Sequence, residues 1–287
     1  MQLKNLALAT TSLVALCLAM PANAAAPIYG QVSLSFGHTW LDQDSSLSND
    51  LDEDFTDLTG GARVAIPYSS TVMVQVGVSG DSTFANADND DNYSGGFGAD
   101  LHVNWHDASD GTLGVFAAVG RSNSINDEST AYFAAGLTGQ YFCDQWTFFG
   151  QLGYIDDSDD PDFLHNAGFV RGGAAYYASK RLKISADLAY GDGEQVSNDG
   201  DASLWAWGLG VDYWFGGSVP ASVFVQYRGL DSETNADGTD EGITTHTVNV
   251  GLKFHFNGTD EVDSDRQFNA ELPNFSRWIH EGGKSID

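Results

Sequence analysis

Hydrophobic and polar residues alternate along most of this chain with a period of two. In the final such run, Val248, Val250, Leu252, Phe254 and Phe256 occupy one phase, and polar or small residues occupy the other. This period is typical of β-strands whose two faces meet different surroundings. Twelve such runs follow one another, at residues 28–40, 57–66, 71–79, 97–106, 112–120, 131–142, 146–154, 168–178, 182–191, 203–215, 222–230 and 247–256. The pattern therefore predicts an all-β protein with twelve strands.

The connections between these runs alternate in length. Longer, acidic connections follow the odd-numbered runs, at 42–56, 80–92, 121–129, 155–166, 192–202 and 231–243. Short connections follow the even-numbered runs, at 67–70, 107–111, 143–145, 179–181 and 216–221. Long loops at one end and tight turns at the other are typical of a transmembrane antiparallel up-and-down β-barrel. An even number of strands would leave both ends of the barrel chain on the tight-turn, periplasmic side.

A soluble β-sandwich would also show alternation and is the alternative architecture. However, the predicted strands exceed the ~5–6 residues typical of globular sheets and suit a tilted membrane crossing. Aromatic residues also gather at strand ends in the apolar phase, where barrels place their interfacial girdles. These residues are Trp40, Trp105, Trp146, Tyr154, Trp205, Tyr213, Phe215 and Phe256. Both observations favour the transmembrane barrel.

As a pattern, residues 28–256 resemble bacterial outer-membrane β-barrel proteins of the porin-like class. The resemblance includes the aromatic-ended last run, which closes on Phe256 and is similar to the signal that the outer-membrane assembly machinery reads. In that class the terminal Phe is normally the last residue, whereas residues 257–287 follow it here. The resemblance implies a location in the outer membrane, contact with its lipid and lipopolysaccharide, and assembly by that machinery.

The N-terminal residues have the pattern of a secretory signal peptide. Lys4 supplies a positive charge, an apolar run follows from Leu6 to Met20, and Ala22-Asn23-Ala24 supplies small residues for cleavage after Ala24. The predicted organisation is a signal peptide at 1–24, a transmembrane β-barrel at 25–257 and a periplasmic C-terminal extension at 258–287.

The C-terminal extension breaks the period of two. Phe275, Trp278 and Ile279 are spaced by three or four residues and would share one face of a helical turn. Three alternatives remain open from the sequence. The segment could dock into the periplasmic mouth of the barrel, bind a periplasmic partner, or stay disordered.

The charge of the chain is strongly negative and unevenly distributed. There are 12 Lys+Arg against 40 Asp+Glu, a formal net charge of −28. This balance argues against a nucleic-acid partner, because neutralising phosphates needs clustered Lys and Arg. Most of the acids fall in the long connections, so we expect an anionic rim on the cell-outward side. Such a rim concentrates cations and repels anions, and salt weakens the effect.

The acidic connections offer oxygen ligands of the kind that calcium and magnesium prefer. The stretch Glu233-x-Asn235-x-Asp237-Gly238 resembles the start of an EF-hand loop, but Thr244 stands where the bidentate carboxylate belongs. We therefore expect weak divalent-cation screening, including bridging to lipopolysaccharide phosphates, or a merely solvated acidic surface, which we favour. The acids that would contribute are Asp156, Asp157, Asp159, Asp160, Asp237 and Asp240. We expect no cofactor.

Other charged residues fall in the polar phase of the predicted strands, which must face the lumen. A Lys or Arg on the lipid face at mid-membrane would cost about 2–4 kcal/mol. These residues are Arg63, Asp100, Arg171, Lys183, Asp187, Asp212, Arg228 and Lys253. Lys183 and Asp212 should sit at similar depth on neighbouring strands and form an ion pair. The set would either line a constriction that filters small solutes or form a salt-bridged network that plugs the barrel.

Catalysis is a weaker interpretation of this sequence. His38 and His246 fall in the lipid-facing phase at the outer ends of the first and twelfth strands, which barrel closure makes neighbours. No Ser shares their face, so a nucleophile and an orienting third group are missing, and we do not expect an enzyme. The sequence predicts an outer-membrane channel for passive diffusion of small hydrophilic solutes or ions. The alternative is a non-conducting structural or surface-interaction barrel whose acidic loops bind cations or partners.

Overall fold

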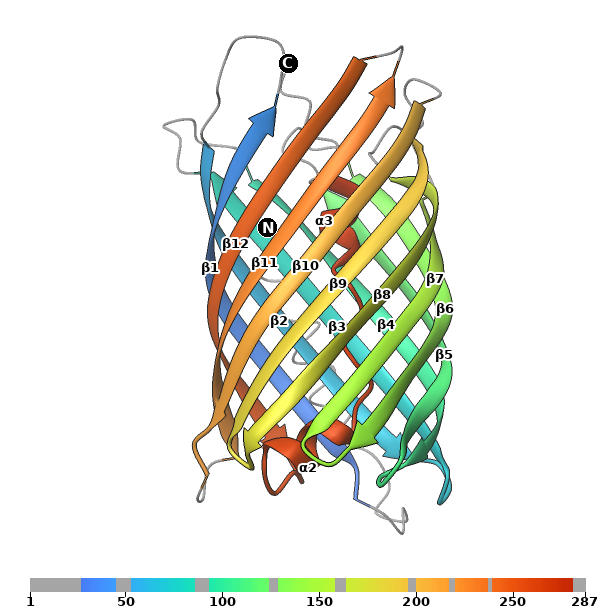
Figure 1. Cartoon of the computed structure of the whole chain (residues 1–287), viewed down its shortest axis with the longest axis vertical. Helices are drawn as coiled ribbons and strands as arrows, with labels where there is room; N and C mark the ends of the chain where they lie inside the picture. The colour runs from blue at the N-terminus through green and yellow to red at the C-terminus, as the bar shows by residue number, and fades with distance from the viewer. Residues whose placement is uncertain are drawn as a thin grey trace.

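The computed structural model describes residues 27–44, 53–85, 93–123, 129–157, 164–195, 200–216, 220–236 and 239–280. Within them, each strand pairs antiparallel with its neighbours along the chain, and β1 pairs with β12 to close a barrel (Figure 1). The strands are β1 (Tyr29–Asp44), β2 (Glu53–Pro67), β3 (Val72–Ala85), β4 (Tyr93–Asp107), β5 (Gly111–Asn123), β6 (Ser129–Cys143), β7 (Trp146–Asp157), β8 (His165–Ser179), β9 (Leu182–Gln195), β10 (Gly200–Trp214), β11 (Ala221–Ala236) and β12 (Thr239–Phe256). The predicted twelve-stranded, all-β barrel is confirmed.

The strands reach further into the long connections than predicted. The connection expected at 231–243 is mostly a continuing hairpin, because β11 ends at Ala236 and β12 begins at Thr239. The connection expected at 42–56 is likewise shortened, since β1 ends at Asp44 and β2 begins at Glu53. Beyond the membrane both faces of a hairpin meet water, so backbone pairing continues where the hydrophobic alternation has ended.

The outer face of the barrel is apolar. Leu34 and Phe36 of β1 point outward and are 49% and 63% exposed, whereas Gln31 and Ser35 of the same strand point inward and are buried. Large exposed apolar side chains continue in the same phase around the other strands. Soluble proteins avoid an exposed apolar surface of this extent, so this face requires a hydrocarbon environment, as the alternation predicts.

The segment that follows β12 runs back into the barrel (Figure 1). Asn257 has a positive φ of 66°, which turns the chain at the end of β12. Helix α2 (Glu261–Arg266) then lies at the tight-turn end, and α3 (Phe275–His280) lies inside the barrel beside β4 and β5. No helix among the described residues is long and apolar enough to cross a membrane.

The structure thus places residues 261–280 of the expected periplasmic extension within the barrel. Docking at the mouth of the barrel, one of the three alternatives, matches the position of α2. The chain then continues beyond α2 through the lumen. The physical reason is that the upper lumen wall is apolar on one side, where the inward residues include Phe116, Phe169 and Leu204. The apolar residues of α3 pack against this part of the wall.

Candidate functional site in the barrel lumen

The lumen holds all eight charged residues that the sequence assigns to it. Six of them line one cavity, namely Arg63, Asp100, Arg171, Asp187, Arg228 and Lys253. The other two, Lys183 and Asp212, are buried nearer the tight-turn end, where they contact α2 and Lys253. The period-two geometry of the strands brings these residues to one interior. The C-terminal segment, residues 257–280, contacts the barrel wall at three levels, which we call lower, middle and upper from the tight turns upward.

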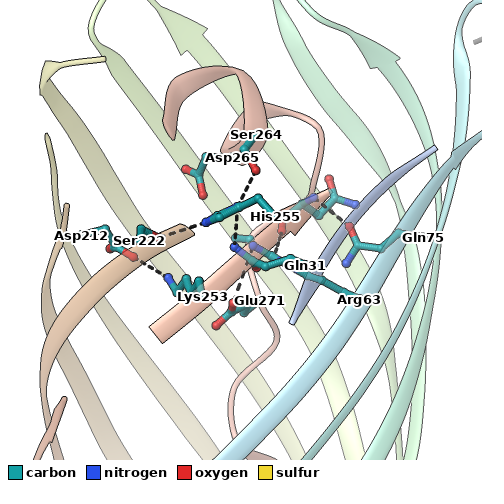
Figure 2. A network of polar contacts seen from close by, with 12 residues as sticks. Gln31, Arg63, Gln75, Asp212, Ser222, Lys253, His255, Ser264, Asp265 and Glu271 are labelled. Carbon is teal, nitrogen blue, oxygen red and sulfur yellow. Dashed lines mark hydrogen bonds and ion pairs between the residues drawn. The ribbon is translucent and has the colours of Figure 1, made fainter. Parts of the chain in front are cut away.

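At the lower level, α2 sits in a cluster of buried charges. The Lys183 ammonium lies 3.6 Å from Asp212 on the adjacent strand, which confirms the predicted ion pair. The same ammonium lies 3.0 Å from Asp265 and 3.4 Å from Glu261, both in α2. Lys253 adds a second cation and donates to Asp212 over 2.6 Å (Figure 2). Two wall lysines therefore face one wall acid and two acids from the segment.

Asp265 is the most strongly held acid of α2. Its carboxylate accepts a hydrogen bond from Lys183 and another, of 2.5 Å, from the buried hydroxyl of Tyr177. Burial alone would raise the pKa of Asp265, but the Lys183 ammonium and the Tyr177 hydroxyl outweigh it and hold that pKa below its ordinary value. Asp265 is therefore ionised at neutral pH and is bound as a carboxylate.

His255 of β12 joins α2 to the barrel wall. One ring nitrogen lies 2.9 Å from the Ser222 hydroxyl of β11, and the other lies 2.7 Å from the Ser264 hydroxyl of α2 (Figure 2). The backbone N–H of Glu261 also donates to the carbonyl of Lys180 in the β8–β9 turn. Both contacts fasten α2 across the tight-turn end.

At the middle level, two arginines hold the extended stretch that follows α2. Arg63 donates to the carbonyl of Asn269 over 3.1 Å, and its guanidinium lies 3.6 Å from the Glu271 carboxylate (Figure 2). Arg171 donates to the backbone carbonyl of Glu271 over 2.5 Å. Gln151 donates to the carbonyl of Ala270 over 3.1 Å. These side chains replace the partners that a strand or helix would give the buried backbone.

A second wall acid organises the remaining middle-level cations. Asp187 of β9 lies 3.2 Å from Arg171 and 3.1 Å from Arg228, so it bridges two guanidinium groups. Asp100 lies 3.1 Å from the ring of His102, which is two residues further along β4 on the same face of the strand. Seven of the eight predicted lumen residues thus take part in ion pairs, and Asp100 instead contacts a histidine ring.

At the upper level, α3 is held by ion pairs of Arg277 and by apolar contacts. Arg277 donates to Asp57 over 2.6 Å, and Asp57 also accepts from Thr39 and Thr83. The side chain of Asp57 is fully buried. Asp57, the first residue of the run predicted at 57–66, is an inward residue of β2 and faces the lumen.

The apolar contacts of α3 confirm the helical face that the spacing of residues in the C-terminal extension predicts. Phe275, Trp278 and Ile279 are 2%, 4% and 0% exposed. Phe169 of β8 makes edge-to-face contacts with the rings of both Phe275 and Trp278. These contacts form a hydrophobic core inside the barrel, where a water-filled pore would have polar side chains.

The charges of the segment match those of the wall along the barrel axis. Glu261, Asp265 and Glu271 of the segment meet wall lysines and arginines at the lower and middle levels. Arg277 meets wall acids at the upper level, Asp57 at 2.6 Å and Asp81 at 3.9 Å. Reversing the segment would place like charges together, so this pattern fixes its direction.

A cavity of about 270 Å³ remains between the segment and the wall. Its lining comes mainly from β1–β4 and β8–β12, with residues 271–275, Arg277 and Trp278 of the segment on the other side. Toward the tight turns, the lumen is closed by Glu261, Ser264 and Phe268, each no more than 2% exposed.

At the long-loop end, two of the expected divalent-cation ligands lie together with a histidine. The Nδ1 atom of His165 lies 2.8 Å from Asp157 and 3.3 Å from Asp156. Their ligand atoms lie within 4.8 Å of one another, which is compatible with one shared cation. Asp159, Asp160 and Asp237 lie outside the described residues, as does the side chain of Asp240. Divalent-cation binding at this rim stays a prediction.

The two histidines of the outer face lie where the sequence places them. β1 and β12 are paired, with Trp40 opposite His246, and the Trp40 ring lies between the rings of His38 and His246. His246 also contacts the Tyr227 hydroxyl at 2.7 Å. This aromatic cluster packs on the outer surface.

The residues of the C-terminal segment that complete the lumen could not be predicted from the sequence pattern. Asp265, Glu271 and Arg277 carry no periodic signal, because the segment is neither strand nor a long helix. A signal was present in the wall, where the run Tyr132-Phe133-Ala134-Ala135 is apolar in both phases. A strand that is apolar on its lumen face as well as its lipid face needs an apolar partner inside the barrel.

Comparison with known proteins identifies the fold. No protein-family model and no curated protein sequence matches the chain. Among solved structures, an outer-membrane channel from Pseudomonas putida F1 is 13% identical, covers 83% of this chain and 99% of its own, and has a TM-score of 0.55. The translocator domain of autotransporter NalP from Neisseria meningitidis (12% identity, 88% and 96% covered) has a TM-score of 0.49. The KdgM porin in complex with disordered oligogalacturonate (11% identity, 78% and 99% covered) has one of 0.47. The chain has the fold of outer-membrane β-barrel proteins, as its sequence pattern predicts.

Proposed function

We propose that this protein is an outer-membrane channel for passive diffusion of small hydrophilic solutes or ions, without cofactor or covalent chemistry. The observation that supports this proposal is the cavity of about 270 Å³ inside a closed barrel, lined by polar and charged side chains beside the C-terminal segment. A cavity of this kind suits small polar solutes, because its lining can replace part of their hydration.

The proposal sets the protein in the outer membrane after export through the signal peptide at 1–24. The long loops face outward, the tight turns and α2 face the periplasm, and the apolar outer face meets lipid and lipopolysaccharide. The aromatic-ended β12 serves the assembly machinery. The acidic loops concentrate cations at the outer mouth, while the lumen residues Arg63, Asp100, Arg171, Lys183, Asp187, Asp212, Arg228 and Lys253 act on solutes further inside.

A second function is favoured by one specific observation. Glu261, Ser264 and Phe268 close the tight-turn end of the lumen and are almost fully buried. If α2 never leaves this position, the barrel does not conduct. Its acidic outer loops would then be the working surface, binding cations or a partner.

Single-channel conductance of the mature full-length protein distinguishes these functions. The protein would be refolded into planar bilayers with a KCl gradient across them. Discrete current steps with a measurable reversal potential are the expected result, and the sign of that potential reports whether anionic rim or cationic lumen controls selectivity. A heat-modifiable, folded barrel that never conducts would refute the channel and favour the surface-binding function.

A further inference from the structure

The cations of the lumen differ in the acids that neutralise them. Lys183 and Lys253 share Asp212, and Arg171 and Arg228 share Asp187, so each of these four has a partner on the barrel wall. Arg63 is the exception among the lumen cations of β1–β12 in the described residues. Its one acid within 4 Å is Glu271, which belongs to the C-terminal segment.

Glu271 is held much more loosely than the wall acids. Its carboxylate lies 3.6 Å from Arg63, beyond hydrogen-bond length, and its side chain is 51% exposed to the lumen. By contrast, Asp212 is 1% exposed and accepts from Lys253 over 2.6 Å. A long ion pair whose acid is half exposed contributes little to stability. A carboxylate from another molecule could therefore replace it at small cost.

Arg63, in turn, is fixed in position without Glu271. Its Nε donates to Gln31 over 2.6 Å, one terminal nitrogen donates to the Asn269 carbonyl, and the guanidinium lies 4.5 Å from the centre of the Phe268 ring. The other terminal nitrogen, Nη2, faces Glu271. A preorganised guanidinium whose remaining donor faces only a loosely held carboxylate is suited to a carboxylate ligand, because little side-chain freedom is lost on binding.

The surroundings of Arg63 limit what can bind there. The cavity of about 270 Å³ lies at the lower edge of the ~300–1,000 Å³ range of small-molecule pockets, so it suits a solute of few carbon atoms. Arg228, which is 37% exposed, lines the same cavity and offers a second guanidinium. The neutral lining includes the amides of Gln226 and Asn249.

We propose that Arg63 is the recognition residue of a lumen site for small carboxylate-bearing solutes, and that Glu271 occupies this site as an internal competitor. The proposal deepens the channel function and rests on it for the identity of the solutes as cargo. Binding itself is a separate property that does not require conduction.

Isothermal titration calorimetry on the refolded full-length protein in detergent tests the site, with succinate as the probe and neutral succinamide as its size-matched comparison. Glu271→Gln removes the competing charge and should tighten succinate binding about two- to five-fold, the equivalent of about 0.4–1 kcal/mol. Arg63→Gln should weaken it at least ten-fold. Succinamide should bind to neither variant more tightly than to the unmodified protein.

Two variants serve as matched controls for these charge changes. Asp110→Asn and Arg181→Gln alter exposed charges in the tight turns, outside the cavity, and should leave succinate affinity unchanged. Because misfolding cannot produce the gain expected for Glu271→Gln, this variant keeps the proposal falsifiable even if Arg63→Gln does not fold. Equal succinate affinity in the unmodified protein and Glu271→Gln, or equal affinity for succinate and succinamide, would overturn the proposed site.

Conductance separates a failure of the site from a failure of the channel. In bilayers, Glu271→Gln should shift the reversal potential toward anion selectivity, and succinate should reduce the chloride current of the unmodified protein. Current steps that neither Glu271→Gln nor succinate alters would refute the site and leave the channel standing. Arg63-dependent succinate binding by a barrel that never conducts would refute the channel and leave the site standing.

Discussion

The contact between Asp265 and the barrel wall provides the sharpest test of how the lumen would open under the proposed channel function. Asp265 accepts hydrogen bonds from Lys183 and Tyr177, and both donors are buried. Its pKa is lowered, so Asp265→Asn removes a full negative charge at neutral pH while preserving the shape of the side chain. If α2 must leave its position before solutes pass, this substitution should make opening easier.

The expected magnitude follows from the two hydrogen bonds. A hydrogen bond to a charged group contributes about 1.5–3 kcal/mol and a neutral one about 0.5–1.5 kcal/mol, so the bond from Tyr177 weakens by roughly 1–1.5 kcal/mol. The bond from Lys183 keeps its charged donor but loses its charged acceptor, and we assign it a loss of similar size. Lys183 keeps Asp212 and Glu261 as partners, so it does not become an uncompensated buried charge. The sum, about 2–3 kcal/mol, corresponds to a roughly 30- to 150-fold larger ratio of released to docked α2.

Single-channel recording and hydrogen exchange would measure this ratio in two ways. Open probability should rise in Asp265→Asn, and the amides of residues 261–268 should exchange faster by a similar factor. Asp263→Asn is the matched control, because Asp263 lies in the same helix but its carboxylate accepts from the exposed Thr259 and not from the wall. Asp265→Asn that behaves like Asp263→Asn in both measurements would refute the view that this cluster holds the lumen closed.

Three further substitutions test the upper level. Trp278→Ala should cost the docking of α3 about 3–5 kcal/mol, seen as faster exchange of residues 275–279, whereas Trp105→Ala on the outer face should leave that exchange unchanged. Arg277→Gln leaves the fully buried Asp57 without its cation, so the free energy of unfolding measured in urea should fall by about 3–5 kcal/mol. Adding Asp57→Asn should recover part of that loss. A double mutant whose loss equals the sum of the two single losses would contradict the pairing. Gly96→Ala should lower the thermal midpoint, because its Cβ would lie 2.4 Å from that of Ser276 and 2.7 Å from the Arg121 carbonyl, while Gly168→Ala, with nothing within 4 Å, should not.

The barrel could be predicted because a membrane imposes one simple requirement on every strand. One face meets hydrocarbon and the other does not, so Leu34 and Phe36 must alternate with residues such as Ser35. The same requirement sends Arg63, Lys183 and Asp212 inward. Strand neighbours then follow from chain order, which is why the Lys183–Asp212 ion pair could be foreseen.

The occupied lumen could not be predicted in the same way. The path of residues 257–280 is set by individual contacts, such as Arg277 with Asp57 and Asp265 with Lys183, between positions more than 80 residues apart. No local pattern encodes such pairs. Phe169 did not indicate an occupied lumen either. A single inward aromatic residue is only an exception to the alternation of its strand, and its role becomes clear only from its contacts with Phe275 and Trp278.

The two ends of the segment differ in what their release would expose. Under the proposed channel function, this difference determines where the lumen would open. Releasing α3 would expose Phe275, Trp278 and Ile279, at about 1.5–3 kcal/mol each, and would leave Asp57 buried without a cation, at about 3–5 kcal/mol. Releasing α2 would break ion pairs whose wall members retain one another, since Lys183 and Lys253 both keep Asp212. Releasing α2 therefore costs less free energy than releasing α3. We expect solutes to pass when α2 is displaced and α3 stays bound to the wall. Under this mechanism Trp278→Ala should change the exchange of residues 275–279 without raising open probability as much as Asp265→Asn does.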